Sequence, residues 1–365
     1  MIFWMISPRR TFRFCRAADG TRLAYARTGT GPAIVKTCMW LNDIETEAAS
    51  PLWRSWIELL SRDRELIAQD LRGCGLSDRS AADVSLAAWV GDLEAVVDSA
   101  GLNSFVLVGV SQGAATAVEF AARHPDRVAG LILCGGYLQG VLKRNPSKAD
   151  RERALAIATM VEFGWGLENA AFRQVFSSRF FPDGSPEQLA WMNEQMKSCT
   201  TPDMAVRILR AMYEIDVSAA ATRVTCPTLV MHSTLDEMVP FESGRTMAAT
   251  IPGARFVRLD SRNHLPRPTQ PAWAVLSSEV ETFLAGLDVE ERRSSPHKFS
   301  GMTPRECELL ERVAQGLDNA TIAVELGLSE KTVRNYVSSL LDKVGVQTRS
   351  RLIVAARKSG YGASA

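Results

Sequence analysis

The sequence lacks any apolar run long enough to cross a membrane. A transmembrane helix needs about 20 predominantly apolar residues, whereas the apolar stretch at residues 1–6 ends at Ser7, Pro8 and two arginines. A secretory signal would carry its positive charge before a longer apolar segment. We therefore expect a cytoplasmic protein with no membrane partner, and we leave open whether residues 1–6 belong to the folded domain.

The sequence also lacks closely spaced cysteines. Its seven cysteines form no CxxC pair and show no metal-ligand spacing, since they stand at positions 15, 38, 74, 134, 199, 226 and 307. Dispersed cysteines are typical of a reducing compartment, where most of them act as small core residues. We expect no metal site and no cofactor.

Charge of one sign does not dominate. The sequence has 42 Lys and Arg and 41 Asp and Glu, which give a formal net charge of +1. The overall balance thus indicates neither nucleic acid nor a membrane surface, and charge has to be considered locally. The length of 365 residues suggests about two domains. A charged and then Ser/Pro-rich stretch predicts a linker at 289–299, between a domain at 10–288 and a second domain at 300–365.

Short apolar runs alternate with helical patterns in the first domain. The runs that we predict to be strands lie at 33–35, 105–108, 130–134, 228–231 and 255–259, and two clear helical patterns lie at 87–100 and 114–123. This alternation predicts an α/β fold with a doubly wound, mostly parallel sheet. Residues of about 138–223 break the alternation and look helical and aromatic, so we expect them to form a cap over the C-terminal edge of the sheet.

The sequence Gly109-Val110-Ser111-Gln112-Gly113 joins an apolar strand directly to a helix. A serine in such a turn has a strained backbone, and the flanking glycines avoid a collision. Its hydroxyl lies at the helix N-terminus, where the helix dipole favours negative charge. We therefore predict that Ser111 is a nucleophile and that the backbone N–H of Gln112 is one donor of an oxyanion hole.

A serine nucleophile needs a base, and the base needs an acid that orients it. Of four histidines, three lie at a helix end, at a strand end and in the linker: His124, His232 and His297. His264 follows the last strand, at the same sheet edge as Ser111, and Asp236 follows the preceding strand. Taken singly, Asp236 could be a turn residue and His264 a loop residue. Together with Ser111 they stand in the order of a hydrolase triad, which predicts catalytic roles for all three.

These features resemble the α/β-hydrolase fold from about Phe12 to Leu287. Asp-Leu-Arg-Gly-Cys-Gly-Leu-Ser at 70–77 is similar to a turn of that family, D-x-R-G-x-G-x-S, and His-Pro-Asp-Arg-Val at 124–128 supports the resemblance. The family usually carries His-Gly after the third strand, whereas this chain has Cys38-Met39-Trp40. The second oxyanion donor would come from Met39 or its neighbour Trp40. Losing one such donor costs ~10²–10³ in rate, so an active hydrolase and a pocket that only binds both remain open.

Four helices are predicted after residue 302. The first begins at a Thr303 cap and ends at Gly316, and the others cover 319–326, a segment capped by Ser329, and 349–358. Apolar residues at helical spacing would bury one face of the third helix: Val333, Val337, Leu340, Leu341 and Val344. Seven Lys and Arg at 331–358 face one acid, so the local charge is +6 in a nearly neutral chain. That concentration is typical of a surface that binds a phosphate backbone.

This segment resembles the LuxR/GerE-type helix-turn-helix over some 55 residues. The resemblance rests on T-P-R-E at 303–306, I-A-x-x-L-G-L-S at 322–329 and K-T-V-R-N at 331–335. It implies that the DNA-facing residues are Lys331, Thr332, Arg334, Asn335 and Ser338, and that double-stranded DNA is a partner. Tyr336 stands where the family usually has histidine. The last helix would form the contact of a homodimer on two-fold symmetric DNA. The alternative for the segment alone is a small helical interaction domain.

Together, the two segments predict a DNA-binding transcription regulator whose hydrolase-fold domain senses or processes a small molecule. The second hypothesis is an active serine hydrolase that acts on an ester, amide or related acyl substrate and carries an accessory DNA-binding module. A purely structural fusion is a third. Labelling of Ser111 by a fluorophosphonate probe, compared with the effect of Ser111→Ala on regulation, discriminates between the first two.

Overall fold

The computed structural model describes the chain apart from residues 1–9, 41–42, 295–301, 347, 359–360 and 363–365, and apart from the side chains of 289–294 and 358. The six apolar N-terminal residues therefore lie outside the described part. The chain divides into two compact units after Leu284. No described helix is both long and apolar enough to span a bilayer.

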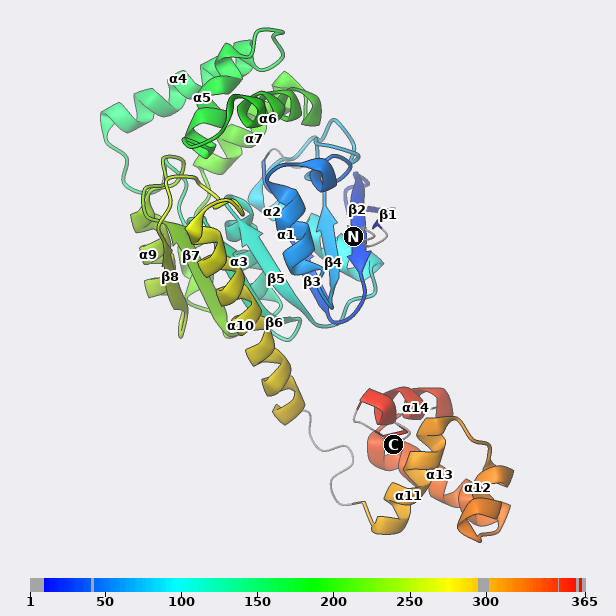
Figure 1. The fold of residues 1–365 in the computed structure, drawn as a ribbon. Coiled ribbons are helices and arrows are strands. Elements are labelled where there is room, and N and C mark those ends of the chain that lie inside the picture. The colour runs from blue at the N-terminus through cyan, green and yellow to red at the C-terminus, as the bar shows by residue number, and fades with distance from the viewer. Residues whose placement is uncertain (1–9, 41–42, 295–301, 347, 359–360, 363–365) are drawn as a thin grey trace, which may run out of the picture. The chain divides into compact units, whose positions relative to one another are not determined.

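The first unit is built on an eight-stranded sheet with the strand order β1-β2-β4-β3-β5-β6-β7-β8 (Figure 1). The strands are β1 Arg10–Arg16, β2 Arg22–Gly29, β3 Ala33–Lys36, β4 Glu65–Gln69, β5 Phe105–Val110, β6 Val128–Cys134, β7 Thr228–Ser233 and β8 Arg255–Leu259. β2 pairs antiparallel with β1 and β4, and the other pairings are parallel. The predicted mostly parallel α/β fold is confirmed.

Helices cover this sheet, as parallel strands require. They are α1 Trp53–Leu60, α2 Leu86–Ser99, α3 Gly113–Arg123, α9 Phe241–Thr250 and α10 Pro271–Ser294, with a 3₁₀ turn at Glu47–Ala49. Every residue of β5 is buried, which follows from its continuous apolar sequence. β5 therefore lies inside the core, and its C-terminal end delivers Ser111 to the sheet edge.

α10 corrects the predicted linker. It continues to Ser294, so the first six residues of the predicted linker at 289–299 are helical, and the remaining five lie outside the described part. The physical reason is that the Glu-Glu-Arg-Arg run at 290–293 has high intrinsic helix propensity. A charged segment without apolar periodicity can extend a helix that is already formed.

The cap consists of α4 Lys148–Gly164, α5 Ala171–Phe180, α6 Pro186–Cys199 and α7 Pro202–Tyr213, followed by the short α8 Ser218–Ala221. Figure 1 shows these helices above one end of the sheet. The fully buried guanidinium of Arg173 donates hydrogen bonds to the carbonyl oxygens of Trp165, Leu167 and Asn193. One side chain thus joins the end of α4, α5 and α6 by satisfying carbonyl groups that would otherwise be buried without partners.

The second unit contains α11 Pro304–Gln315, α12 Asn319–Leu326, α13 Glu330–Val344 and α14 Arg349–Lys358. Thr303 and Glu306 form a capping box at α11, and Ser329 caps α13. Left-handed glycines end the first three helices: Gly316, Gly327 and Gly345. Apolar side chains of all four helices form one buried cluster. This arrangement confirms the predicted small all-α domain.

Candidate active site and DNA-binding surface

Ser111 occupies the turn between β5 and α3 with a φ of 53°, a left-handed conformation that non-glycine residues rarely adopt. Its N–H donates to the carbonyl oxygen of Cys134 at 2.9 Å, which ties the turn to the end of β6. A Cβ on Gly109 would lie 2.6 Å from Cα of Ala114, and one on Gly113 would lie 2.4 Å from Oγ1 of Thr37. The two glycines are therefore needed for close packing around the turn.

His264 and Asp236 lie together at the same edge. Nδ1 of His264 is 2.7 Å from Oδ2 of Asp236, and both side chains are fully buried. Within the described part of the chain, Nε2 of His264 is buried and has no hydrogen-bond partner. The segment after β6 lies close to both His264 and Ser111. A Cβ on Gly135 would be 3.0 Å from the His264 ring, and one on Gly136 would be 3.3 Å from the carbonyl oxygen of Ser111. The free ring nitrogen is the one that a base acting on serine must use.

Asp236 is held as a carboxylate. Burial by itself raises the pKa of Asp236. The pKa is nevertheless held well below its usual range by the charge of His264, by hydrogen bonds from His232 and His264, and by the backbone N–H of Val239. Oδ1 accepts the N–H groups of Met238 and Val239 at 2.8 and 3.0 Å. The carboxylate is therefore fixed in orientation as well as in charge.

His232 is a neighbour of this site that the sequence reasoning set aside. Its Nε2 lies 3.0 Å from the carbonyl oxygen of Val239 and 3.4 Å from Oδ2 of Asp236. Asp236 thus lies between two buried imidazoles. The four-residue separation of His232 and Asp236 across a strand end was the signal available, but the path of the turn between them could not be read from it.

The loop after β3 lies directly beside the serine turn. Oγ1 of Thr37 donates to the carbonyl oxygen of Gly113 at 3.0 Å, and the Trp40 N–H donates to Oε1 of Gln112 at 3.2 Å. The Trp40 amide is therefore engaged. Among the described residues, the backbone N–H groups of Met39 and Gln112 have no protein acceptor. These two are the amides that the sequence assigned to the oxyanion hole.

Aromatic side chains of the cap close over this region. The Trp40 ring stacks on Trp165 with centroids 5.2 Å apart and meets Phe176 edge-on at 5.4 Å. Phe180 contacts the His264 ring at 5.1 Å, and its carbonyl oxygen accepts the His264 N–H at 2.9 Å. Ser111 is only 7% exposed.

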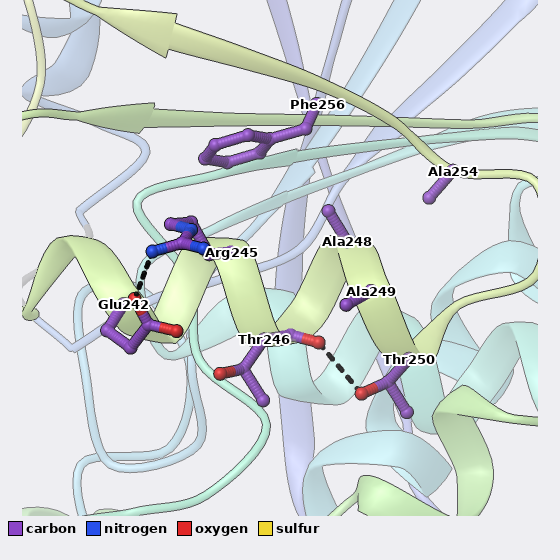
Figure 2. A pocket seen from close by; sticks show the side chains of 8 residues that line it. All are labelled: Glu242, Arg245, Thr246, Ala248, Ala249, Thr250, Ala254 and Phe256. Carbon is purple, nitrogen blue, oxygen red and sulfur yellow. Dashed lines mark hydrogen bonds and ion pairs between the residues drawn. The ribbon is translucent and has the colours of Figure 1, made fainter.

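An open groove of about 500 Å³ lies elsewhere, between α9 and β8 (Figure 2). Its lining includes Arg245, paired with Glu242, and Phe256 from β8. It contains none of the residues Ser111, Asp236 and His264. We therefore do not assign it to the chemistry of the triad.

The predicted DNA-facing residues lie on α13 as follows. Lys331, Arg334, Asn335 and Ser338 are exposed, while Thr332 is half-buried and shares a 2.8 Å hydrogen bond with the Ser329 hydroxyl at the helix cap. The opposite face contributes to the buried cluster through four residues: Val333, Val337, Leu340 and Val344. α13 therefore presents a polar face with free donors.

Not every basic residue of this unit is available to a ligand. Nζ of Lys343 lies 2.7 and 2.9 Å from the two carboxylate oxygens of Glu306. Arg349 donates to Asn319 and to a backbone carbonyl, and Arg357 donates to the carbonyl oxygen of Ala314. These three cations stabilise the helical unit, so the local charge of +6 overstates what can reach phosphates.

Comparison with known proteins supports both segments. The family model described as alpha/beta hydrolase fold matches residues 46–267, and the model described as bacterial regulatory proteins, luxR family, matches residues 300–356. The chain is 25% identical over 268 residues to pyrrolizixenacetamide deacetylase of Xenorhabdus hominickii, and the match covers 73% of this chain and 96% of that protein. It is 30% identical over 239 residues to 2-hydroxymuconate semialdehyde hydrolase of Pseudomonas putida, which covers 62% and 79% respectively.

Solved structures show the same architecture. A thermophilic esterase from Thermogutta terrifontis superposes with a TM-score of 0.62 at 26% identity and covers 76% of this chain and 99% of that one. An esterase from Exiguobacterium antarcticum gives a TM-score of 0.63 at 22% identity, covers 75% and 98%, and shows the fold alone. The chain belongs to the α/β-hydrolase fold family and carries a LuxR-type helix-turn-helix domain, which implies DNA binding, at its C-terminal end.

Proposed function

We propose that this protein is a transcription regulator whose hydrolase-fold domain binds a small acyl compound at Ser111 and thereby alters DNA binding by α13. One observation carries the proposal. The chain joins a domain in which Ser111 and the paired side chains of His264 and Asp236 are buried after strand ends to a helix with an exposed polar and basic face. The names of the two relatives refer to small organic molecules, which agrees with a compact ligand under the cap.

The chemistry available to a bound ester or amide is acyl transfer. Oγ of Ser111 attacks the carbonyl carbon, Nε2 of His264 takes the hydroxyl proton, and Asp236 stabilises the resulting imidazolium. The N–H groups of Gln112 and Met39 stabilise the negative charge on the carbonyl oxygen. His264 then gives its proton to the leaving group, and water releases the acyl group by the same steps in reverse order.

A specific observation favours the second function, an active serine hydrolase with an accessory DNA-binding module. Nε2 of His264 is buried and has no hydrogen-bond partner among the residues that the structure describes, and it lies on a ring paired with a carboxylate whose pKa is held low. An unpaired buried nitrogen costs free energy, and a serine hydroxyl or its proton would remove that cost. The two functions therefore use the same residues and differ in whether binding or turnover at Ser111 is coupled to DNA binding.

Coupling is reciprocal, so one experiment separates the two functions. A fluorophosphonate probe is reacted with the full chain, the labelled residue is identified by mass spectrometry, and the DNA affinity is measured before and after labelling. For a regulator we expect labelling at Ser111 to change the dissociation constant for DNA by about 5- to 150-fold. Ser111→Ala is the unlabelled control. Efficient labelling with no change in DNA affinity would leave only the hydrolase.

On the DNA side, we assign base and phosphate contacts to Lys331, Thr332, Arg334, Asn335 and Ser338, and a homodimer contact to α14. Val354 of α14 is a large apolar side chain that is 55% exposed, which suits such a contact. We expect Val354→Glu to weaken binding to a duplex with two half-sites more than binding to one half-site. Equal weakening on both duplexes would contradict the assignment of α14.

A further inference from the structure

The loop that replaces the usual His-Gly segment of this family is fastened by the side chain next to the nucleophile. Gln112 is fully buried, and its Oε1 accepts the Trp40 N–H at 3.2 Å. Because a backbone N–H can only donate, this contact fixes which end of the amide faces the loop. The Nε2 atom of Gln112 has no partner among the described residues, so the contact with Trp40 alone orients the side chain.

The same loop is fixed at two further points. Oγ1 of Thr37 donates to the carbonyl oxygens of Gly113 and Val108 at 3.0 and 3.3 Å, which secures its beginning. The Trp40 ring is clamped between Trp165 at the end of α4 and Phe176 of α5. Met39 therefore lies between a residue bonded to the serine turn and a residue bonded to Gln112, while its own N–H has no acceptor in the described part of the chain.

We propose that Gln112 is a positioning residue that holds the backbone at Trp40, so that the Met39 N–H serves as the second oxyanion donor without the glycine that the family normally uses there. Gln112 acts twice in this arrangement. Its backbone N–H is one donor, and its side chain places the other. The inference rests on the proposed role of Ser111 and adds the reason why the departure at Met39-Trp40 does not remove the oxyanion hole.

The Trp40 ring also connects the loop to the cap, through its contacts with Trp165 and Phe176. The Trp40 ring can leave Trp165 and Phe176 when a ligand displaces the cover, whereas the Trp40 backbone remains bonded to Gln112. Without that bond, movement of the ring would be transmitted to the Met39 amide. Gln112 thus keeps the N–H groups of Met39 and Gln112 in place when the cap moves.

The test uses the full chain and Gln112→Met, which keeps the length of the side chain and removes the acceptor. Gln139→Met is the matched control, because the exposed amide of Gln139 bonds to Asp216, which belongs to neither the serine turn nor the loop. Two quantities are measured in each protein. They are the steady-state hydrolysis of p-nitrophenyl acetate and the hydrogen exchange of the Trp40 amide, followed by mass spectrometry with fragmentation.

We expect Gln112→Met to lower kcat and kcat/KM together, by at least about 10-fold and up to the ~10²–10³ that follows loss of a donor, with KM unchanged. The oxyanion exists only in the transition state, so a change in KM alone would contradict the inference. We also expect the Trp40 amide to exchange at least about 10-fold faster in Gln112→Met than in wild type and Gln139→Met, because the bond that protects it is gone.

The two measurements separate this inference from the proposed function. If wild type neither hydrolyses the ester nor reacts with a fluorophosphonate, the nucleophile assignment fails, and exchange at Trp40 alone decides whether Gln112 holds the loop. If exchange at Trp40 is the same in all three proteins, the inference is overturned whatever the activity. If Gln112→Met lowers the melting temperature without changing kcat, the inference is also overturned, because Gln112 would then contribute only to packing.

Discussion

The salt dependence of DNA binding is the sharpest prediction for the helical unit. Seven basic residues lie between 331 and 358. Three are engaged in contacts within the unit, namely Lys343, Arg349 and Arg357, and the side chain of Lys358 is not described. The cations that remain exposed are Lys331, Arg334 and Arg351. Arg334 pairs with Glu330 at the surface, a contact that phosphate can replace.

The number of free cations sets the magnitude. The logarithm of the binding constant falls with the logarithm of salt concentration by about 0.9 for each phosphate neutralised on B-DNA. Three contacts per unit give a slope of about −3 for one unit and between about −5 and −6 for two. Counting all seven basic residues would instead give about −6 for one unit. Replacing Arg334 by Ala lowers the slope by about 1 per unit if it contacts phosphate.

The assay is fluorescence anisotropy of a labelled duplex, titrated with the protein at several salt concentrations between about 50 and 200 mM. Arg245→Ala is the control, because that arginine is exposed on the hydrolase-fold unit and should leave the slope unchanged. A wild-type slope near −6 per unit would refute the assignment of Lys343, Arg349 and Arg357 to structural roles. A slope that Arg334→Ala does not change would remove Arg334 from the phosphate contacts.

Three further predictions concern the hydrolase-fold unit. Gly113→Ala should abolish labelling of Ser111 and lower stability by about 1–3 kcal/mol in chemical unfolding, because the added Cβ would lie 2.4 Å from Oγ1 of Thr37; retention of both properties would contradict the packing described. Asp236→Asn should slow labelling by up to about 10⁴-fold, measured against Ser111→Ala, because the amide favours the wrong tautomer of the base. Burial, followed by the carboxylates of Glu47 and Asp43, raises the pKa of Asp70 to about 8 against two backbone N–H bonds. The folded state thus keeps a proton that the unfolded chain loses near pH 4. The stability of the wild type should therefore fall as the pH rises from about 4 to 8. In thermal unfolding, the loss of stability caused by Asp70→Asn should be smaller at about pH 9 than at about pH 5.

The patterns that depend on neighbours in sequence were predictable. The strand ending at Val110 and the helix beginning at Gly113 follow from apolar runs and from glycine spacing, and they extend the predicted segments at 105–108 and 114–123 by two residues and one residue. The helices of the second unit follow from caps such as Thr303 and Ser329, because a capping bond spans only three residues. Local chemistry determines these elements almost completely.

The contacts that hold the site were not predictable, because their partners are distant in sequence. Nothing near Trp40 indicates that its ring stacks on Trp165 or that its amide bonds to Gln112. The same holds for Lys343, which the sequence counts as a free charge and the fold pairs with Glu306. The roles of Ser111, His264 and Asp236 remain predictions, which the labelling experiments test.

The bond between the His264 amide and the Phe180 carbonyl has a consequence for how occupancy can be observed. If α5 withdraws, this bond breaks. The His264 N–H then has to donate to water, or the loop that carries His264 has to rearrange. The ¹⁵N resonance of that single amide should therefore report an open or closed site directly, even for a compound that is never transformed and leaves no product to detect.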